Sequence, residues 1–202
     1  MRRNIILTGL LLVAVFVIVD KTSEALSPPQ YPKIIKLNVA SFNPPKPIDI
    51  DQMHCLATNI YHEARGETVN GKFAVAHVTM NRVSSDRFPN SVCAVVYQAH
   101  MRTNWKGVSV PKRHKCQFSW YCDGKSDAII LRTADGKVIK YNMDAWEESL
   151  KVATTILKHD VYDSTYGATH YFNDKLADPF WAEHYVQVAQ IDNHVFHRMD
   201  TY

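Results

Sequence analysis

The chain has 202 residues, of which 46% are hydrophobic and 21% charged, so it can bury a core and is not intrinsically disordered. This length predicts one domain of ordinary size with an additional terminal segment. The formal net charge is only +3, and no stripe of lysine and arginine with interleaved aromatic residues stands out, which excludes nucleic acid as the expected partner. A mildly basic surface instead suits loose attraction to an anionic polymer.

The first 25 residues have the pattern of an export signal. Two arginines precede an apolar stretch from Ile5 to Val19, whose fifteen residues reach about 22 Å as a helix and so fall short of a ~30 Å hydrocarbon core. Ser23 and Ala25 are the small residues expected before a cleavage site. We expect residues 1–25 to be a cleaved signal peptide, or alternatively an uncleaved transmembrane anchor at the inner membrane. Either reading exports the rest of the chain to the periplasm, cell envelope or extracellular space.

Prolines separate this segment from the folded part of the chain. Six of the nine prolines lie between Ser27 and Asp51. Each proline removes a backbone donor and restricts the residue before it, so the stretch predicts an extended linker. The predicted boundaries are a linker over residues 26–50 and a single domain over residues 51–202.

Two helices follow the linker. With Asp51 as N-cap, apolar residues recur at steps of three and four from Met53 to Ala64, and Gly66 marks the end of this amphipathic helix. The next segment, residues 70–83, is apolar on nearly all sides and predicts a buried core helix.

The middle of the chain is less regular. Ser91 is expected to cap a short helix that runs to about His100, and residues 101–128 show no periodicity. Residues 129–131 and 138–141 flank a turn sequence and predict a β-hairpin.

The last part of the chain predicts one helix and then strands. Apolar residues recur from Met143 to Leu157 behind Asn142, the expected cap of a fourth helix. Residues 170–172, 185–191 and 194–198 have the composition of short strands. The predicted fold class is therefore α+β, with the helices first.

The four cysteines are expected to form disulfides because the chain is exported. Cys116 and Cys122 enclose only five residues, which favours that small loop together with a Cys55–Cys93 bridge among the three possible pairings. A structural zinc site is the rival interpretation, but the spacings include no C-x-x-C pair.

Glu63 is the first candidate for chemistry. It lies at the edge of the apolar helix face, where desolvation raises a carboxyl pKa as general acid catalysis requires. Position alone is more typical of a solvated glutamate at a helix end. The metalloprotease motif H-E-x-x-H is absent because Gly66 stands where its second histidine is needed. The ten histidines are scattered, and the one close pair, His194 and His197, would point to opposite faces of a strand, so structural histidines are favoured over a catalytic zinc site. We predict neither a metal site nor a cofactor.

Several ordered motifs resemble one known family. They are the Cys55–Glu67 segment containing E-A-R-G-E, the Gly71–Val83 segment, Phe88-Pro89, Cys93–Gln98, Cys116–Gly124, Gly167–Phe172 with Trp181, and Ile191–Arg198. Together they span about residues 52–198 and are similar to the SleB-type cell-wall hydrolases, which are named for spore-cortex-lytic enzymes and also occur in bacteriophage lysis genes.

The resemblance implies a mainly helical, lysozyme-like α+β fold with a small hairpin or sheet. It also implies cleavage of peptidoglycan between N-acetylmuramic acid (MurNAc) and N-acetylglucosamine (GlcNAc), with Glu63 as the catalytic acid/base. His62, Asp192 and Asn193 depart from the usual family pattern and leave details of the groove open.

A single glutamate favours a lytic transglycosylase, in which the C6 hydroxyl of the sugar attacks C1 and leaves a 1,6-anhydro end. The alternative is a hydrolytic muramidase, which needs a second carboxylate. Glu67, Asp86 and Asp123 are its candidates. Less favoured alternatives are a zinc amidase and a non-catalytic wall-binding module.

The resemblance also implies supporting roles in binding peptidoglycan. Gln117, Ser119 and Tyr171 are the expected substrate-binding residues, although Gln117 and Ser119 could instead only tie their loop to the domain. We expect a monomer. A compact domain behind an export signal, without a spore-targeting repeat, favours a phage endolysin over a bacterial enzyme.

Overall fold

The computed structural model describes residues 47–199. The predicted signal peptide or anchor over residues 1–25, and the predicted linker as far as residue 46, lie outside the described residues. Within residues 47–199, no helix is long and apolar enough to cross a membrane.

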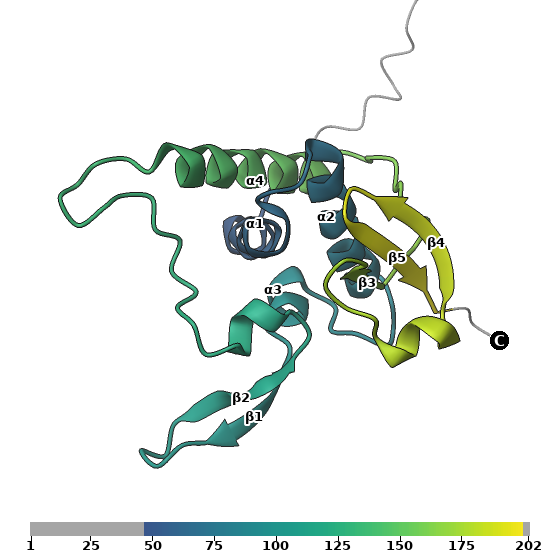
Figure 1. Cartoon of the computed structure of the whole chain (residues 1–202), viewed down its shortest axis with the longest axis horizontal. Coiled ribbons are helices and arrows are strands. Elements are labelled where there is room, and N and C mark those ends of the chain that lie inside the picture. Colours follow the sequence, from purple (N-terminus) through teal and green to yellow (C-terminus); the bar gives the residue numbers. More distant parts are fainter. Residues whose placement is uncertain (1–46, 200–202) are drawn as a thin grey trace, which may run out of the picture. The chain divides into compact units, whose positions relative to one another are not determined.

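Four α-helices form the larger part of the structure. They are α1 (Ile50–Ala64), α2 (Val69–Val83), α3 (Val92–Val96) and α4 (Lys140–Lys158). Figure 1 shows α1 end-on, with α4, α2 and α3 arranged around it, and α1 contacts all three of these helices. This central place explains why α1 carries so many buried side chains.

The first two helices agree with the sequence patterns. Leu56 and Ile60 of α1 are completely buried, and so are Val75 and Val78 of α2. The cap of α1 differs from the prediction: Asp49 is the N-cap, and its side chain accepts hydrogen bonds from the amides of residues 51 and 52. The predicted cap, Asp51, lies in the first turn.

The short helix α3 ends earlier than predicted, and a hairpin follows it. The hairpin pairs β1 (Ala99–Thr103) with β2 (Ser109–Cys116) in antiparallel register. The predicted short helix and its cap Ser91 are confirmed, but its predicted end at His100 is wrong, and the stretch without periodicity contains most of this hairpin. No side chain of either strand is buried, so no alternation of apolar and polar residues marks them.

The hairpin predicted for residues 129–141 is confirmed only in part. The chain turns back on itself there through an isolated bridge between Arg132 and Val138 and a backbone hydrogen bond from Ile139 to Leu131, but neither predicted segment forms a strand. The helix α4 begins at Lys140, with Ile139 as N-cap, instead of behind Asn142. Asn142 lies inside α4, and its side-chain amide donates to the Ile130 carbonyl at 2.8 Å.

The end of the chain forms a three-stranded antiparallel sheet in the order β3-β5-β4. Its strands are β3 (His170–Asn173), β4 (Val186–Ile191) and β5 (His194–Arg198). The sheet packs on α2 through a buried cluster of Ala74, Val78, Ala168 and Phe196. The three predicted strands and the α+β class are confirmed.

Two disulfides and two 3-10 helices complete the structure. Cys55–Cys93 joins α1 to α3. Cys116–Cys122 joins the end of β2 to the 3-10 helix η2 (Ser119–Cys122), and a second 3-10 helix, η3 (Phe180–His184), precedes β4. The pairing is the one that the short Cys116–Cys122 loop favoured.

Candidate active site

Glu63 lies in the last turn of α1, where the helix turns its side chain towards a cavity of about 790 Å³. The cavity is bordered by α1, by η2 with the loop after it, and by β3. A carboxylate at a helix C-terminus is not stabilised by the helix dipole. Burial raises the pKa of Glu63, although a hydrogen bond from Tyr171 and the charge of Arg82 oppose this shift. The net shift is towards the protonated form of Glu63, which is the form needed to donate a proton.

Tyr171 joins β3 to the end of α1. Its hydroxyl donates a hydrogen bond to Glu63 Oε2 at 3.0 Å. Its ring packs against His194 and Phe196 of β5, and it touches the core of the helices as well as that of the sheet. Burial and the neighbouring Glu63 raise the pKa of Tyr171 well above its usual value, so Tyr171 remains a hydrogen-bond donor.

Arg82 supplies a positive charge behind the carboxyl group. It is 5% exposed, its Nε donates to the Thr169 carbonyl at 2.8 Å, and its guanidinium lies over the rings of Phe88 and Phe118. Its Nη1 is buried without a hydrogen-bond partner among the described residues. The guanidinium is therefore held beside the cavity with one donor free for a bound group.

The predicted substrate-binding residues line the same cavity. Gln117 and Ser119 are both exposed and belong to its wall, on either side of the buried Phe118 in the sequence. The Cys116–Cys122 bridge closes the loop that carries them. The structure therefore brings Glu63, Gln117, Ser119 and Tyr171 to one cavity.

His62 stands beside Glu63 and belongs to the cavity wall. Its ring stacks on Trp120 with centroids 4.5 Å apart, and its Nε2 lies 3.2 Å from the Asp127 carbonyl oxygen. The Trp120 indole donates to Asn59 at 3.0 Å, which fixes the stacked pair to the core. Burial lowers the pKa of His62, so this ring is neutral near neutral pH.

The three candidates for a second carboxylate differ in position. Glu67 and Asp123 line the cavity, but Asp86 is exposed and does not. The Glu67 carboxylate accepts two hydrogen bonds from Asn193, at 3.1 and 3.2 Å. Asp127 is a further carboxylate on the wall, and the sequence analysis missed it.

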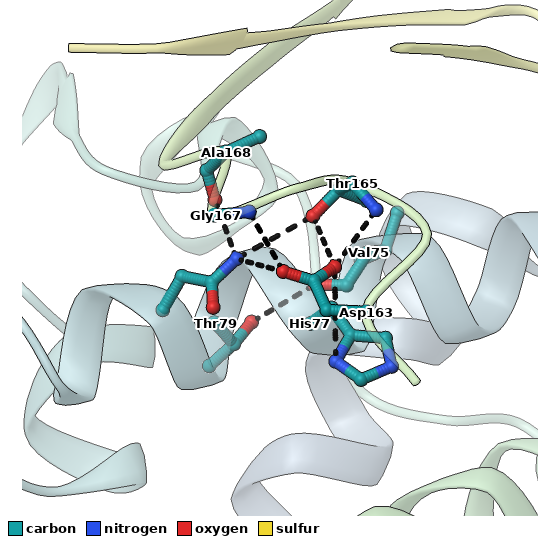
Figure 2. A network of polar contacts seen from close by, with 8 residues as sticks. Val75, His77, Thr79, Asp163, Thr165, Gly167 and Ala168 are labelled. Atoms are coloured by element: carbon teal, nitrogen blue, oxygen red, sulfur yellow. Dashed lines mark hydrogen bonds and ion pairs between the residues drawn. The ribbon is translucent and has the colours of Figure 1, made fainter. Parts of the chain in front are cut away.

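A polar network holds the chain that leads into β3. Figure 2 shows Asp163 accepting from the amide and hydroxyl of Thr165 and from the amide of Gly167. Asn81 of α2 donates to Asp163 at 2.9 Å and to the Ala168 carbonyl at 3.0 Å. The network thereby anchors residues 163–168 on α2, three residues before Tyr171.

The turn between β4 and β5 is held against the start of α2. Asp192, which has a positive φ of 52°, accepts hydrogen bonds from the amide and hydroxyl of Thr68. Asn193 contacts Glu67 and also accepts from Lys175. Asp192 and Asn193, two of the three residues that depart from the family pattern, therefore hold this turn against Thr68 and against Glu67 of the cavity wall.

Comparison with known proteins identifies the family. The sequence profile of the family described as cell wall hydrolase matches residues 66–197, well over half of the chain. The chain belongs to the cell wall hydrolase family. This confirms the resemblance to the SleB-type cell-wall hydrolases, although Glu63 itself lies three residues before the matched range.

Curated relatives of this cell wall hydrolase are spore cortex-lytic enzymes. That of Bacillus subtilis (strain 168) is 26% identical over 164 residues, which are 81% of this chain and 43% of the relative. That of Halalkalibacterium halodurans is 27% identical over 154 residues, which are 76% of this chain and 37% of the relative. The chain thus spans less than half the length of the curated relatives it matches.

Two solved structures that resemble this chain are catalytic domains of SleB proteins. The catalytic domain of the Bacillus cereus SleB protein matches with a TM-score of 0.48 and 24% sequence identity, covering 78% of this chain and 97% of the other. The catalytic domain of the germination-specific lytic transglycosylase SleB from Bacillus anthracis matches with the same TM-score and identity, covering 76% of this chain and 99% of the other.

The sequence analysis of this cell wall hydrolase missed two wall residues, Arg82 and Asp127. Arg82 could have been found, because an arginine in a helix predicted to be buried on all sides requires a partner. Nothing in the irregular stretch around Asp127 indicated which of its residues face the cavity. Within residues 47–199, no group of three or more histidine, cysteine, aspartate or glutamate side chains is arranged to hold a metal ion.

Proposed function

We propose that this protein cleaves the glycan strands of peptidoglycan between MurNAc and GlcNAc, as a lytic transglycosylase with Glu63 as its only acid/base. The observation that carries the proposal is the position of Glu63: a carboxyl group with a raised pKa, bonded to Tyr171 on the wall of a cavity of about 790 Å³. Membership of the cell wall hydrolase family supports the substrate class.

In the proposed reaction Glu63 first donates its proton to the glycosidic oxygen as the bond to C1 of MurNAc breaks. The resulting carboxylate is then stabilised by the Tyr171 hydroxyl and by the charge of Arg82. It removes the proton of the C6 hydroxyl of MurNAc, whose oxygen attacks C1 to form the 1,6-anhydro sugar. Glu63 is protonated again at the end, and no water is consumed.

Substrate contacts follow from the walls of the cavity. Gln117 and Ser119 present a side-chain amide and a hydroxyl to the cavity, which suit the N-acetyl and hydroxyl groups of the sugars. The Nη1 of Arg82, which has no hydrogen-bond partner among residues 47–199, suits a carbonyl or hydroxyl oxygen of the sugar next to Glu63.

A hydrolytic muramidase is the second candidate, because Glu67, Asp123 and Asp127 line the same cavity. Such an enzyme needs a carboxylate about 5 Å from the acid for retention, or about 6.5–9.5 Å for inversion. Of these three, Glu67 is held in place on the wall by two hydrogen bonds from Asn193.

We further propose that the protein acts outside the cytoplasmic membrane, delivered by the predicted export signal. Two disulfides within residues 47–199 support this location, since disulfides persist in oxidising compartments. Whether the source is a phage or a bacterium stays a prediction of the sequence.

Mass spectrometry of the muropeptides released from purified sacculi by residues 26–202 tests the proposal. We expect products ending in anhydro-MurNAc, about 18 Da lighter than those with reducing ends, because no water is added in the proposed step. Reducing-end products would instead establish the muramidase, and free stem peptides would overturn glycan cleavage.

A further inference from the structure

We propose that the β1–β2 hairpin is a second binding surface for peptidoglycan, whose cationic side chains bind carboxylates of the peptide stems while the glycan occupies the cavity at Glu63. The inference rests on the proposed function, since it takes a glycan strand as the ligand of that cavity. It adds a binding surface that lies outside the catalytic cavity.

The hairpin concentrates positive charge. The sequence contains no aspartate or glutamate between Asp86 and Asp123. The five exposed cationic side chains of the hairpin are Arg102, Lys106, Lys112, Arg113 and Lys115. Their summed charge of +5 exceeds the net charge of the whole chain, which is +3. None of these five forms an ion pair with another residue of the described part of the chain. Their charge is available to an anionic ligand.

A bulge gathers three of the cations at the base of the hairpin. Residue pairs Ala99–Cys116 and Met101–Pro111 enclose one residue on β1 but four on β2. These four, residues 112–115, are all exposed, whereas a regular strand with one buried face would hide alternate side chains. His114, with a φ of 56°, lies in the left-handed region that such an irregularity requires.

The base of the hairpin is adjacent to the catalytic cavity, because one residue lines both that cavity and a cavity at the base. Gln117 lines that cavity and also a second one of about 440 Å³, which includes His100, His114 and Lys115 in its wall. The Gln117 amide donates to the Gln98 carbonyl at 3.0 Å, which closes the base of the hairpin. Figure 1 shows the hairpin extending from this point away from the helices. A polymer leaving the catalytic cavity past Gln117 therefore meets Lys115 and the bulge.

The peptide stems of peptidoglycan fit this arrangement because they carry carboxylates at regular intervals along the glycan. Single exposed ion pairs are weak, but several cations along one polymer add their contributions. The stems also branch from the MurNAc units that the proposed reaction requires in the cavity, so they extend beyond it.

An anionic membrane is the competing occupant. Trp105 at the tip is 89% exposed and lies beside Lys106, a pairing also used at lipid surfaces. Three of the five cations, however, lie in the bulge at residues 112–115 and not at the tip, and Lys115 lines the second cavity. This distribution favours the polymer.

The test measures binding to sacculi that lack secondary wall polymers, with every protein in a Glu63→Gln background so that no strand is cut. The hairpin variant carries Lys112→Gln, Arg113→Gln and Lys115→Gln. The matched control carries Lys137→Gln, Lys151→Gln and Lys158→Gln, which are exposed elsewhere and change the net charge equally. We expect the hairpin variant to bind about tenfold more weakly at low salt and the control to bind like the parent, with the difference closing at about 1 M salt.

A second comparison uses the unmodified hairpin. Amidation of the stem carboxylates should lower the affinity of the parent to that of the hairpin variant and leave the variant unchanged. Equal binding by the hairpin and control variants, or no effect of amidation on the parent, would overturn the proposal. Binding to phosphatidylglycerol vesicles that is abolished by Trp105→Ala, with sacculus binding unchanged in the hairpin variant, would assign the surface to a membrane instead.

The two proposals fail separately. Binding is measured without cleavage, whereas the released muropeptides report only the bond that is cut. If the products had reducing ends but the hairpin variant still bound more weakly than the control, the proposed transglycosylase reaction would be wrong and the proposed binding surface would stand.

Discussion

The Tyr171 hydroxyl donates to Glu63 Oε2 at 3.0 Å and so joins residues that are 108 positions apart in the sequence. The bond stabilises the carboxylate form of Glu63, whereas burial stabilises the protonated form. A group that must first donate and then accept a proton needs both influences, because neither protonation state can be strongly preferred.

Replacing the proposed acid, Glu63→Gln, should reduce the release of muropeptides by more than about 100-fold, since an amide cannot donate the proton. The assay is the rate of clearing of a sacculus suspension with product analysis. Glu147→Gln, on an exposed part of α4, is the matched control and should retain full activity. More than a few per cent of residual activity in Glu63→Gln would remove Glu63 from the role.

Tyr171→Phe should lower kcat about tenfold, because the carboxylate formed during the reaction loses a hydrogen bond. The same loss raises the pKa of Glu63 further, so the alkaline limb of the pH–rate profile should move to higher pH. Tyr162→Phe, at a side chain that is 73% exposed, is the control. An unchanged profile would show that Tyr171 does not act on Glu63.

Glu63 also makes the fold less stable at neutral pH. Its folded pKa lies above the ordinary value of 4.5, so the native state binds more protons than the unfolded state between these two values. The free energy of unfolding contributed by this group therefore falls as the pH rises through that window. We expect Glu63→Gln to have a higher Tm than the wild type at pH 7 and the same Tm below about pH 4. A Tm difference independent of pH would contradict the raised pKa.

Asp163→Ala should lower the free energy of unfolding by about 2–4 kcal/mol, since the replacement leaves donors of Asn81, Thr165 and Gly167 without their acceptor (Figure 2). Urea unfolding of this variant and of Asp160→Ala, at an exposed aspartate, gives the comparison. Equal stability of the two variants would show that the network contributes little.

The two disulfides should contribute unequally to stability. The Cys55–Cys93 bridge spans 38 positions and the Cys116–Cys122 bridge only 6. By loop-closure entropy, their removal by paired serine substitutions costs about 4 and about 2 kcal/mol. Because the shorter bridge closes the loop carrying Gln117 and Ser119, its removal should lower activity more than the loss of stability explains. If the loss of activity in each variant were explained by its loss of unfolding free energy, the shorter bridge would have no positioning role.

Errors in the sequence analysis have a common physical origin. The helix α1 was predicted because its buried positions repeat with the helical period, and α2 because its segment is apolar on nearly all sides. The β1–β2 hairpin was missed because it is held by backbone hydrogen bonds while its side chains stay in solvent, which leaves no apolar pattern. The positive charge of the hairpin was missed for a related reason. In the net charge of the whole chain, the cations of the hairpin are offset by acidic residues elsewhere in the sequence.

The sequence by itself determined the α+β class, the family and a short set of candidate residues, because periodicity and motifs are local properties of the chain. Only the tertiary structure decided which candidates share a cavity. It placed Tyr171 and Arg82 beside Glu63, left Asp86 outside and bound Glu67 to Asn193. These relations join α1 and α2 to β3 and the β4–β5 turn across long stretches of sequence, and they arise from packing that no local pattern encodes.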